Sequence, residues 1–206
     1  MMIQPGLARI EGFVKITDPS TGEVLVDKKN AIHYENISIA MARTLSNRTA
    51  AQGGGWIYAM AFGNGGSAVD PTGVITYLPP NTTGQNATLY NQTYAKVVDD
   101  NAAGDLDPAN NYMTVLHTSG QPYTDIVVTC TLDYGEPSGQ QAFDNSTNFN
   151  GEYVFDELGL QCYGTSATDL MLITHVIFHP VQKSLNRQIQ IDYTLRIQTL
   201  TNLSAA

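Results

Sequence analysis

Adjacent carboxylates are the residues of this chain best suited to acid–base chemistry, and Asp156 and Glu157 form such a pair inside an apolar segment. Glycoside hydrolases use two carboxyl groups that flank one bond. Consecutive residues of a strand point to opposite faces, so these two side chains are poorly placed to share a substrate. The chain also lacks the G-x-S-x-G pattern of an activated serine. We therefore predict that the protein is not an enzyme, and a polysaccharide hydrolase stays as an alternative.

Two histidines four residues apart, His175 and His179, would form a metal-binding pair on a helix. The apolar, β-branched residues around them predict a strand instead. At about 3.3 Å per residue, the two side chains would then lie roughly 13 Å apart, which is too far for one ion. We predict no metal at this pair, and His33 and His117 have no partner that the sequence identifies.

Hard oxygen ligands gather in the segment 99–111, which could hold calcium. The residues concerned are Asp99, Asp100, Asn101, Asp105, Asp107 and Asn110. The spacing is not that of an EF-hand loop, because Ala103 stands where an acidic ligand is needed and the twelfth position carries no glutamate. We predict a solvated loop, with calcium binding as the alternative.

Glycines in the run Gly63, Asn64, Gly65 and Gly66 could let backbone N–H groups approach a phosphate. No Lys-Ser/Thr pair follows them and no helix is expected there, so neither nucleotide-binding pattern is met. We predict a tight turn, where the glycines leave the backbone free to take positive φ, and no cofactor.

Cys130 and Cys162 are the two cysteines, and both stand in apolar, strand-like contexts. They could form a disulfide, but no C-x-x-C pair and no export signal accompany them. We predict two reduced, buried thiols.

The elements that would carry these residues are mostly strands. The stretch after Gln188 alternates, because one side receives Ile189, Ile191, Tyr193, Leu195 and Ile197. Such alternation is typical of a half-buried strand. Leu170 to Phe178 is a continuous apolar run that suits a strand covered on both faces. We expect the two to be long neighbouring strands joined by a polar loop, Pro180 to Arg187.

The remaining pattern predicts further strands and a single helix. The helix is expected over Ile37 to Leu45, with Asn36 as its cap. Strands are expected over Leu7 to Lys15, Glu23 to Lys28, Trp56 to Phe62, Tyr90 to Val98, Met113 to His117, Asp125 to Tyr134 and Tyr153 to Leu160. We therefore predict an all-β chain of about eight to ten strands, as one β-sandwich or jelly-roll-like domain over residues 1–206 with one short helix and long loops.

Charge excludes several partners. The 206 residues carry a formal net charge of -9 with only ten Lys plus Arg, and these cations do not cluster. Nucleic acid and anionic membrane surfaces both need clustered cations. No apolar run is long enough for a spanning helix. The start MMIQPGLARIEGF lacks a basic region followed by an apolar core, so we expect no export signal.

The loop 67–84 is the segment we expect to touch a partner. Its prolines make regular structure unfavourable and favour an extended path on a neighbour's surface. Exposed apolar groups on a stiff loop bind at small entropic cost. The predicted contact residues are Pro71, Tyr77, Leu78, Pro79 and Pro80.

Two blocks of sequence resemble virion proteins of tailed bacteriophages. The first is DPSTGEVLVDKKNAIHYENISIAMARTL with IYAMAFGNGGSAVDPT, and the second is YVFDELGLQCYG with LMLITHVIFHPVQKSLNRQIQIDYTLRI. The resemblance implies a non-enzymatic part of a virion that is assembled in the host cytoplasm. It implies a homo-oligomer in many symmetric copies, bound to capsid, neck or tail proteins, with capsid decoration ahead of the other positions.

A carbohydrate-binding or adhesin domain of a tail fibre or baseplate is the alternative function. Five tyrosines, Tyr58, Tyr77, Tyr90, Tyr94 and Tyr123, supply aromatic faces, and Asn-rich loops supply hydrogen bonds.

Overall fold

The computed structural model describes residues 8–45, 55–84, 86–137, 152–163 and 169–199. Within them the chain forms thirteen strands and one helix, which confirms the all-β prediction. One sheet has the order β2 (Val24–Lys29), β1 (Ala8–Thr17), β13 (Ile189–Thr199), β9 (Tyr123–Leu132) and β8 (Tyr112–Leu116). The other has the order β3 (Ala31–Ile32), β12 (Thr174–Ser184), β10 (Glu152–Tyr163), β4 (Ile57–Gly63) and β7 (Gln92–Val97), with β11 (Leu170–Leu172) also paired to β10.

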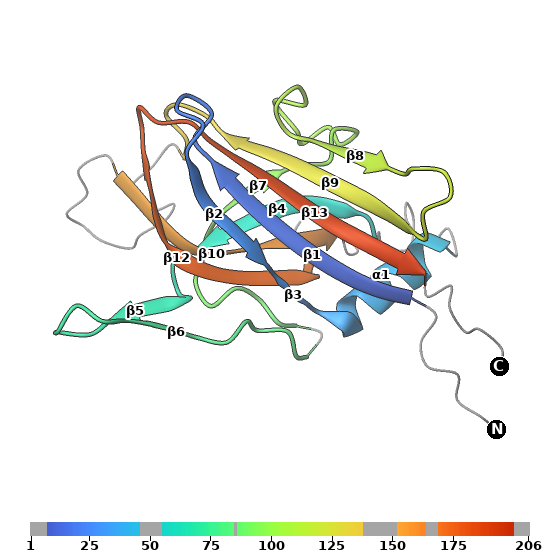
Figure 1. Cartoon of the computed structure of the whole chain (residues 1–206), viewed down its shortest axis with the longest axis horizontal. Helices are drawn as coiled ribbons and strands as arrows, with labels where there is room; N and C mark the ends of the chain where they lie inside the picture. Colours follow the sequence, from blue (N-terminus) through green and yellow to red (C-terminus); the bar gives the residue numbers. More distant parts are fainter. Residues whose placement is uncertain (1–7, 46–54, 85, 138–151, 164–168, 200–206) are drawn as a thin grey trace.

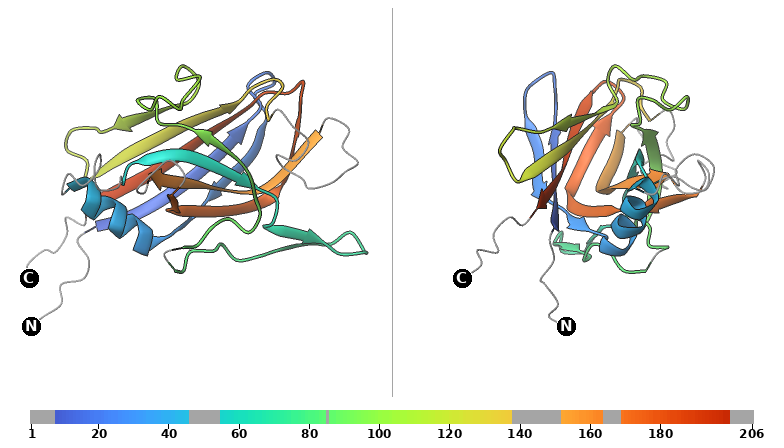
Figure 2. Two further views of the ribbon diagram at one scale, coloured as in Figure 1. Left: turned by 180° about the vertical axis from the view of Figure 1, so that it is seen from behind. Right: turned by 90° about the vertical axis from the view of Figure 1, so that its right-hand side faces the viewer.

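β13 is the centre of the first sheet. It pairs antiparallel with β1 on one side and β9 on the other over most of its length. The predicted alternation is confirmed: Ile189, Ile191 and Tyr193 are fully buried, while Gln190 and Asp192 between them are not. The two sheets face each other in two layers (Figure 2) around one cluster of buried side chains drawn from both sheets.

The apolar run Leu170 to Phe178 differs from the prediction in two ways. It divides into β11 and β12, and β12 continues beyond Pro180 to Ser184. A proline lacks the N–H that a ladder needs, and the pairing of β10 with β12 is irregular between Phe155 and Glu157, which face this part of β12. β12 and β13 also belong to different sheets, so the short loop after Ser184 carries the chain from one layer to the other.

The helix α1 (Tyr34–Leu45) begins before the predicted start. Its N-terminal cap is His33, whose Nδ1 accepts a hydrogen bond from the N–H of Asn36 at 3.3 Å. Asn36 is not the cap. It lies inside the first turn, fully buried, and its Nδ2 donates to the carbonyl of Leu172 at 2.8 Å. Because an imidazole nitrogen can replace the usual cap oxygen as acceptor, the common cap residues were a misleading signal here.

Both cysteines are free and buried, as predicted. Burial raises the pKa of Cys130 and of Cys162 to about 12, so neither forms a thiolate at neutral pH. Among the described residues, no helix has the length and hydropathy needed to cross a membrane.

The predicted loop 67–84 contains regular structure. β5 (Ser67–Val69) and β6 (Ile75–Tyr77) form a separate two-stranded hairpin. The prediction of an irregular segment was wrong because Pro71 stands in the turn, where it interrupts no ladder, and β-branched residues flank it. Figure 1 shows this hairpin, which we call the arm, projecting from the two layers at the end opposite α1.

Candidate functional site

Glu157 holds the segments beneath the arm. One carboxylate oxygen accepts the N–H groups of Gly65 and Asn91 at 3.0 and 2.8 Å. The other accepts the N–H of Tyr90 at 3.0 Å and a ring nitrogen of His175 at 2.9 Å. A carboxylate offers about four lone-pair sites, and here all are used.

Asp156 holds the start of the arm itself. Its two oxygens accept the N–H of Gly66 at 2.9 Å and the N–H of Ser67 at 2.8 Å, and the Ser67 hydroxyl also donates to it. The irregular pairing of β10 at this point lets two consecutive carboxylates bind one turn. The two acids were expected to face opposite sides of a strand, and in the structure both accept hydrogen bonds from consecutive residues, Gly65 to Ser67.

His175 is held by a hydrogen bond at each ring nitrogen. Its Nδ1 accepts the N–H of Asn81 at 2.8 Å, so Nδ1 carries no proton. The proton then sits on Nε2 and is donated to Glu157. His179, in contrast, is exposed and lies 3.2 Å from the Tyr77 hydroxyl, so the two histidines engage different partners. We call Asp156, Glu157 and His175 the buried clasp.

Burial and hydrogen bonding act in opposite directions on Glu157. Burial alone would raise its pKa, but the bonds from His175 and from the three backbone N–H groups hold the pKa below its ordinary value. A general acid needs the reverse shift. The clasp is thus suited to holding backbone in place.

The turn after β4 requires glycine because other atoms approach its backbone too closely to leave room for a side chain. Gly63, Gly65 and Gly66 do not adopt the positive φ that glycine allows. A Cβ on Gly63 would lie 2.5 Å from both the Asn91 carbonyl oxygen and Glu157 Oε1. The glycines do let backbone N–H groups reach anions, but the anions are the chain's own carboxylates.

The arm is ordered at its tip by Asp70. This carboxylate accepts the N–H groups of Thr72 and Val74 at 2.7 and 3.1 Å and the Thr72 hydroxyl at 2.6 Å. Pro71 lies in this turn, exposed. Two-stranded hairpins are marginal on their own, so the turn at the tip and the clasp at the base both stabilise the arm.

The other predicted contact residues lie where the arm rejoins the body. Tyr77 ends β6, and the N–H of Leu78 bonds the Gly66 carbonyl at 2.9 Å. The carbonyl of Pro79 accepts the Tyr90 hydroxyl at 2.7 Å, and Pro80 is exposed beside it. All five predicted contact residues are therefore exposed, with Pro71 at the tip of the arm and the other four at its base.

Sequence reasoning missed the most exposed aliphatic groups of the arm. Val69 and Val74 are 63% and 56% exposed. A signal was present, because Val69, Val74 and Ile75 are β-branched residues on either side of a Pro-Thr-Gly turn, which is a hairpin pattern.

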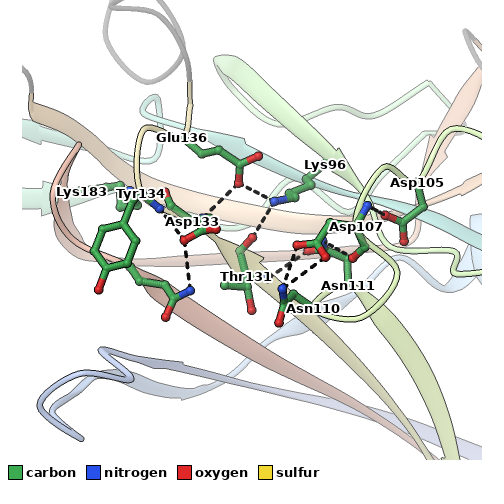
Figure 3. A network of polar contacts seen from close by, with 11 residues as sticks. Lys96, Asp105, Asp107, Asn110, Asn111, Thr131, Asp133, Tyr134, Glu136 and Lys183 are labelled. Carbon is green, nitrogen blue, oxygen red and sulfur yellow. Dashed lines mark hydrogen bonds and ion pairs between the residues drawn. The ribbon is translucent and has the colours of Figure 1, made fainter.

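A second buried polar network ties three strands together (Figure 3). Lys96 of β7 donates to the Thr131 carbonyl at 2.7 Å and to Glu136. Lys183 of β12 donates to the carbonyls of Asp133 and Ser184 at 2.9 and 3.1 Å. Burial lowers the pKa of Lys183 to about 8. Both ammonium groups therefore donate hydrogen bonds to backbone carbonyl groups near the ends of strands.

The acidic segment after β7 folds onto its own backbone, as Figure 3 shows for its second half. Asp99 accepts the N–H of Asn101 at 3.1 Å, and Asp105 accepts that of Asp107 at 2.9 Å. Asp107 accepts Asn110 Nδ2 with both oxygens. Across the described ranges, no three His, Cys, Asp or Glu side chains gather closely enough to hold a metal ion.

An apolar cavity of about 410 Å³ opens between the two layers beside α1. Its wall includes Met41 of α1, Trp56, Leu195 of β13, and Met113 and Val115 of β8. Polar side chains are nearly absent from its wall, so the cavity can bind apolar groups by packing but offers few hydrogen-bonding partners.

Three of the five tyrosines of the carbohydrate alternative pack against other side chains. Tyr58 packs edge-on against Tyr163 with ring centroids 5.2 Å apart, and Tyr94 packs on Phe62. Tyr123 belongs to the other sheet and lies under the Arg196 guanidinium at 3.9 Å.

Comparison with known proteins identifies no relative. No protein-family model matches this chain, and no curated protein and no solved structure is significantly similar to it.

Proposed function

We propose that this chain is a non-enzymatic structural subunit of a tailed-bacteriophage virion, present in many copies and bound to capsid or tail proteins through its arm. Of the possible positions in the particle, we favour decoration of the capsid over a place in the neck or tail. The observation that supports this proposal is the arm itself: an exposed, apolar hairpin held at its tip by Asp70 and at its base by the buried clasp.

A pre-ordered hairpin is suited to binding proteins. Ordering a loop on association costs free energy. The arm is already ordered in the folded chain, so it loses little conformational entropy when it binds. Its exposed side chains are mostly aliphatic or uncharged, and desolvating them leaves no buried charge without a partner.

The non-enzymatic part of the proposal has its own support. The two acids best suited to chemistry have their oxygens occupied by backbone donors. The virion location is proposed because the amino-terminal and carboxy-terminal blocks resemble virion proteins. Assembly in the host cytoplasm is part of the same proposal.

Removal of the arm tests the proposal. Replacing Ala68–Thr76 by Asn-Gly keeps the paired residues Ser67 and Tyr77 and joins them by a favoured two-residue turn. We expect this variant to fold but to be lost from purified particles. The matched control, Leu106→Lys, changes a 93% exposed residue outside the arm and should be incorporated normally. Incorporation of the arm-shortened chain at the wild-type level would contradict the proposal.

A further inference from the structure

Charged residues are nearly absent from the stretch of sequence that carries the arm. Residues 49–95 contain one, Asp70, and Asp70 is engaged in the tip turn. A second run without Asp, Glu, Lys or Arg, residues 108–124, contains β8. In a chain of net charge -9, two copies repel each other over most of their surfaces. Contact between copies is least opposed where both surfaces are uncharged.

β8 is a sheet edge without the usual protection. Across the part of the chain that the structure describes, β8 pairs with β9 alone. Edge strands commonly carry charges that block pairing with another chain. The opposite edge of the same sheet, β2, carries Asp27, Lys28 and Lys29, whereas β8 reads Tyr-Met-Thr-Val-Leu. Val115 and Leu116 of β8 are 66% and 53% exposed.

The arm presents an open strand edge. β5 approaches β12 at the base of the arm, whereas β6 has no strand partner other than β5 among the described residues. β6 has three residues and β8 has five, so β6 is long enough to cover part of the β8 edge.

The surface behind β8 adds a pocket. Met113 and Val115 line the apolar cavity between the layers. A strand added beside β8 continues the sheet, and its alternate side chains then face the same cavity. Main-chain hydrogen bonds with pockets for alternate side chains are the two parts of recognition by strand addition.

We propose that β6 of one copy adds to the outer edge of β8 of the next copy, with apolar side chains of the arm packed over the cavity behind β8. This rests on the arm being the partner-binding surface and names a second copy of the chain as its partner. The arm and β8 lie at opposite ends of the molecule (Figures 1 and 2). The contact is therefore head-to-tail, which builds a ring or a filament.

Single lysines on each surface test the contact. Val74→Lys changes the arm, Val115→Lys changes β8, and Leu106→Lys is the control at an exposed site outside both. Each change is on an exposed residue, and Thr114→Lys is a second β8 variant should Val115→Lys lower stability. By light scattering on a sizing column, we expect wild type and control to form oligomers. Each interface variant should self-associate at least about tenfold more weakly.

Mixing the two interface variants gives the sharpest result. The Val74→Lys copy keeps a functional β8, and the Val115→Lys copy keeps a functional arm. One contact can then form, so the mixture should give 1:1 dimers although each variant alone is monomeric. An arm-to-arm contact would not be restored in this way.

Several outcomes overturn the inference. These are a wild-type chain that stays monomeric at its highest soluble concentration, oligomers of Val115→Lys and Thr114→Lys equal to those of wild type, or a mixture without dimers. If the wild type is monomeric while Val74→Lys is lost from particles, the arm binds a different virion protein. In that case the proposed function stands and the inference fails.

Discussion

His175 Nε2 lies 2.9 Å from Glu157 Oε2, and both side chains are fully buried. The pair joins β12 to β10 and, through Glu157, fixes the backbone of the turn after β4 and of the segment before β7. Its position under the arm means that the body of the protein and its projecting hairpin share one set of hydrogen bonds.

Replacing Glu157 should destabilise the fold strongly. In Glu157→Gln an amide NH₂ faces backbone donors, so buried N–H groups lose their acceptor. We expect the free energy of unfolding to fall by about 3 kcal/mol. Urea denaturation measures it, with Glu35→Gln on the exposed face of α1 as the control. A loss equal to that of the control would show that the clasp is not a stabilising element.

Gly63 should not tolerate a methyl group. The Cβ of Gly63→Ala would meet the Asn91 carbonyl oxygen at 2.5 Å, and backbone cannot move aside cheaply. We expect a loss of about 2 kcal/mol in thermal or urea unfolding. Gly104→Ala is the matched control, because its nearest neighbour is the end of the Tyr58 side chain, which can rotate. Equal losses in both variants would contradict the close-approach explanation.

Loss of the Asp70 side chain should loosen the arm without lowering the stability of the rest of the fold. Asp70→Ala removes the acceptor of the Thr72 and Val74 N–H groups, in a hairpin that packs little against the body. Global stability should change by less than about 0.5 kcal/mol, while the amides of Thr72 and Val74 exchange with solvent faster. Hydrogen exchange followed by NMR measures both, and Asp100→Ala serves as the control. Unchanged exchange at these amides would mean that Asp70 does not order the arm.

Stability should fall at acid pH partly through Asp18. Hydrogen bonds from Ser20, and the Arg187 side chain beside it, lower the pKa of Asp18 to about 2. An unfolded aspartate titrates at about 3.9. Between these values the unfolded chain binds the extra proton, so the contribution is present above about pH 4 and is lost as the pH falls through 2.

The variant Asp18→Asn isolates this contribution. The difference in free energy of unfolding between wild type and variant should shrink as the pH falls from about 5 to 2. Parallel curves from urea denaturation over that range would exclude Asp18 as a source of the acid dependence.

Periodicity predicted the all-β fold because burial acts directly on side-chain type. The alternation from Ile189 to Ile197 predicted most of the length of β13. Periodicity could not show that β12 and β13 join different sheets, because either arrangement buries the same residues. It also missed the continuation of β12 past Pro180, since a local irregularity that tolerates proline has no periodic signal.

The site was predicted in part, for similar reasons. The segment that carries the arm was identified from exposed apolar residues and prolines, yet its hairpin form was missed. The clasp could not be predicted, because Glu157 and His175 meet residues 65, 81, 90 and 91 only after distant segments pack together. His33 as a helix cap was missed because histidine is an uncommon cap residue.

Averaged images of purified particles that carry a labelled copy of this chain test the central claim most directly. The account predicts label at many symmetry-related positions on the particle, with the arm of each copy against a neighbouring protein. Particles without label, or label at positions where the arm points only into solvent, would contradict it.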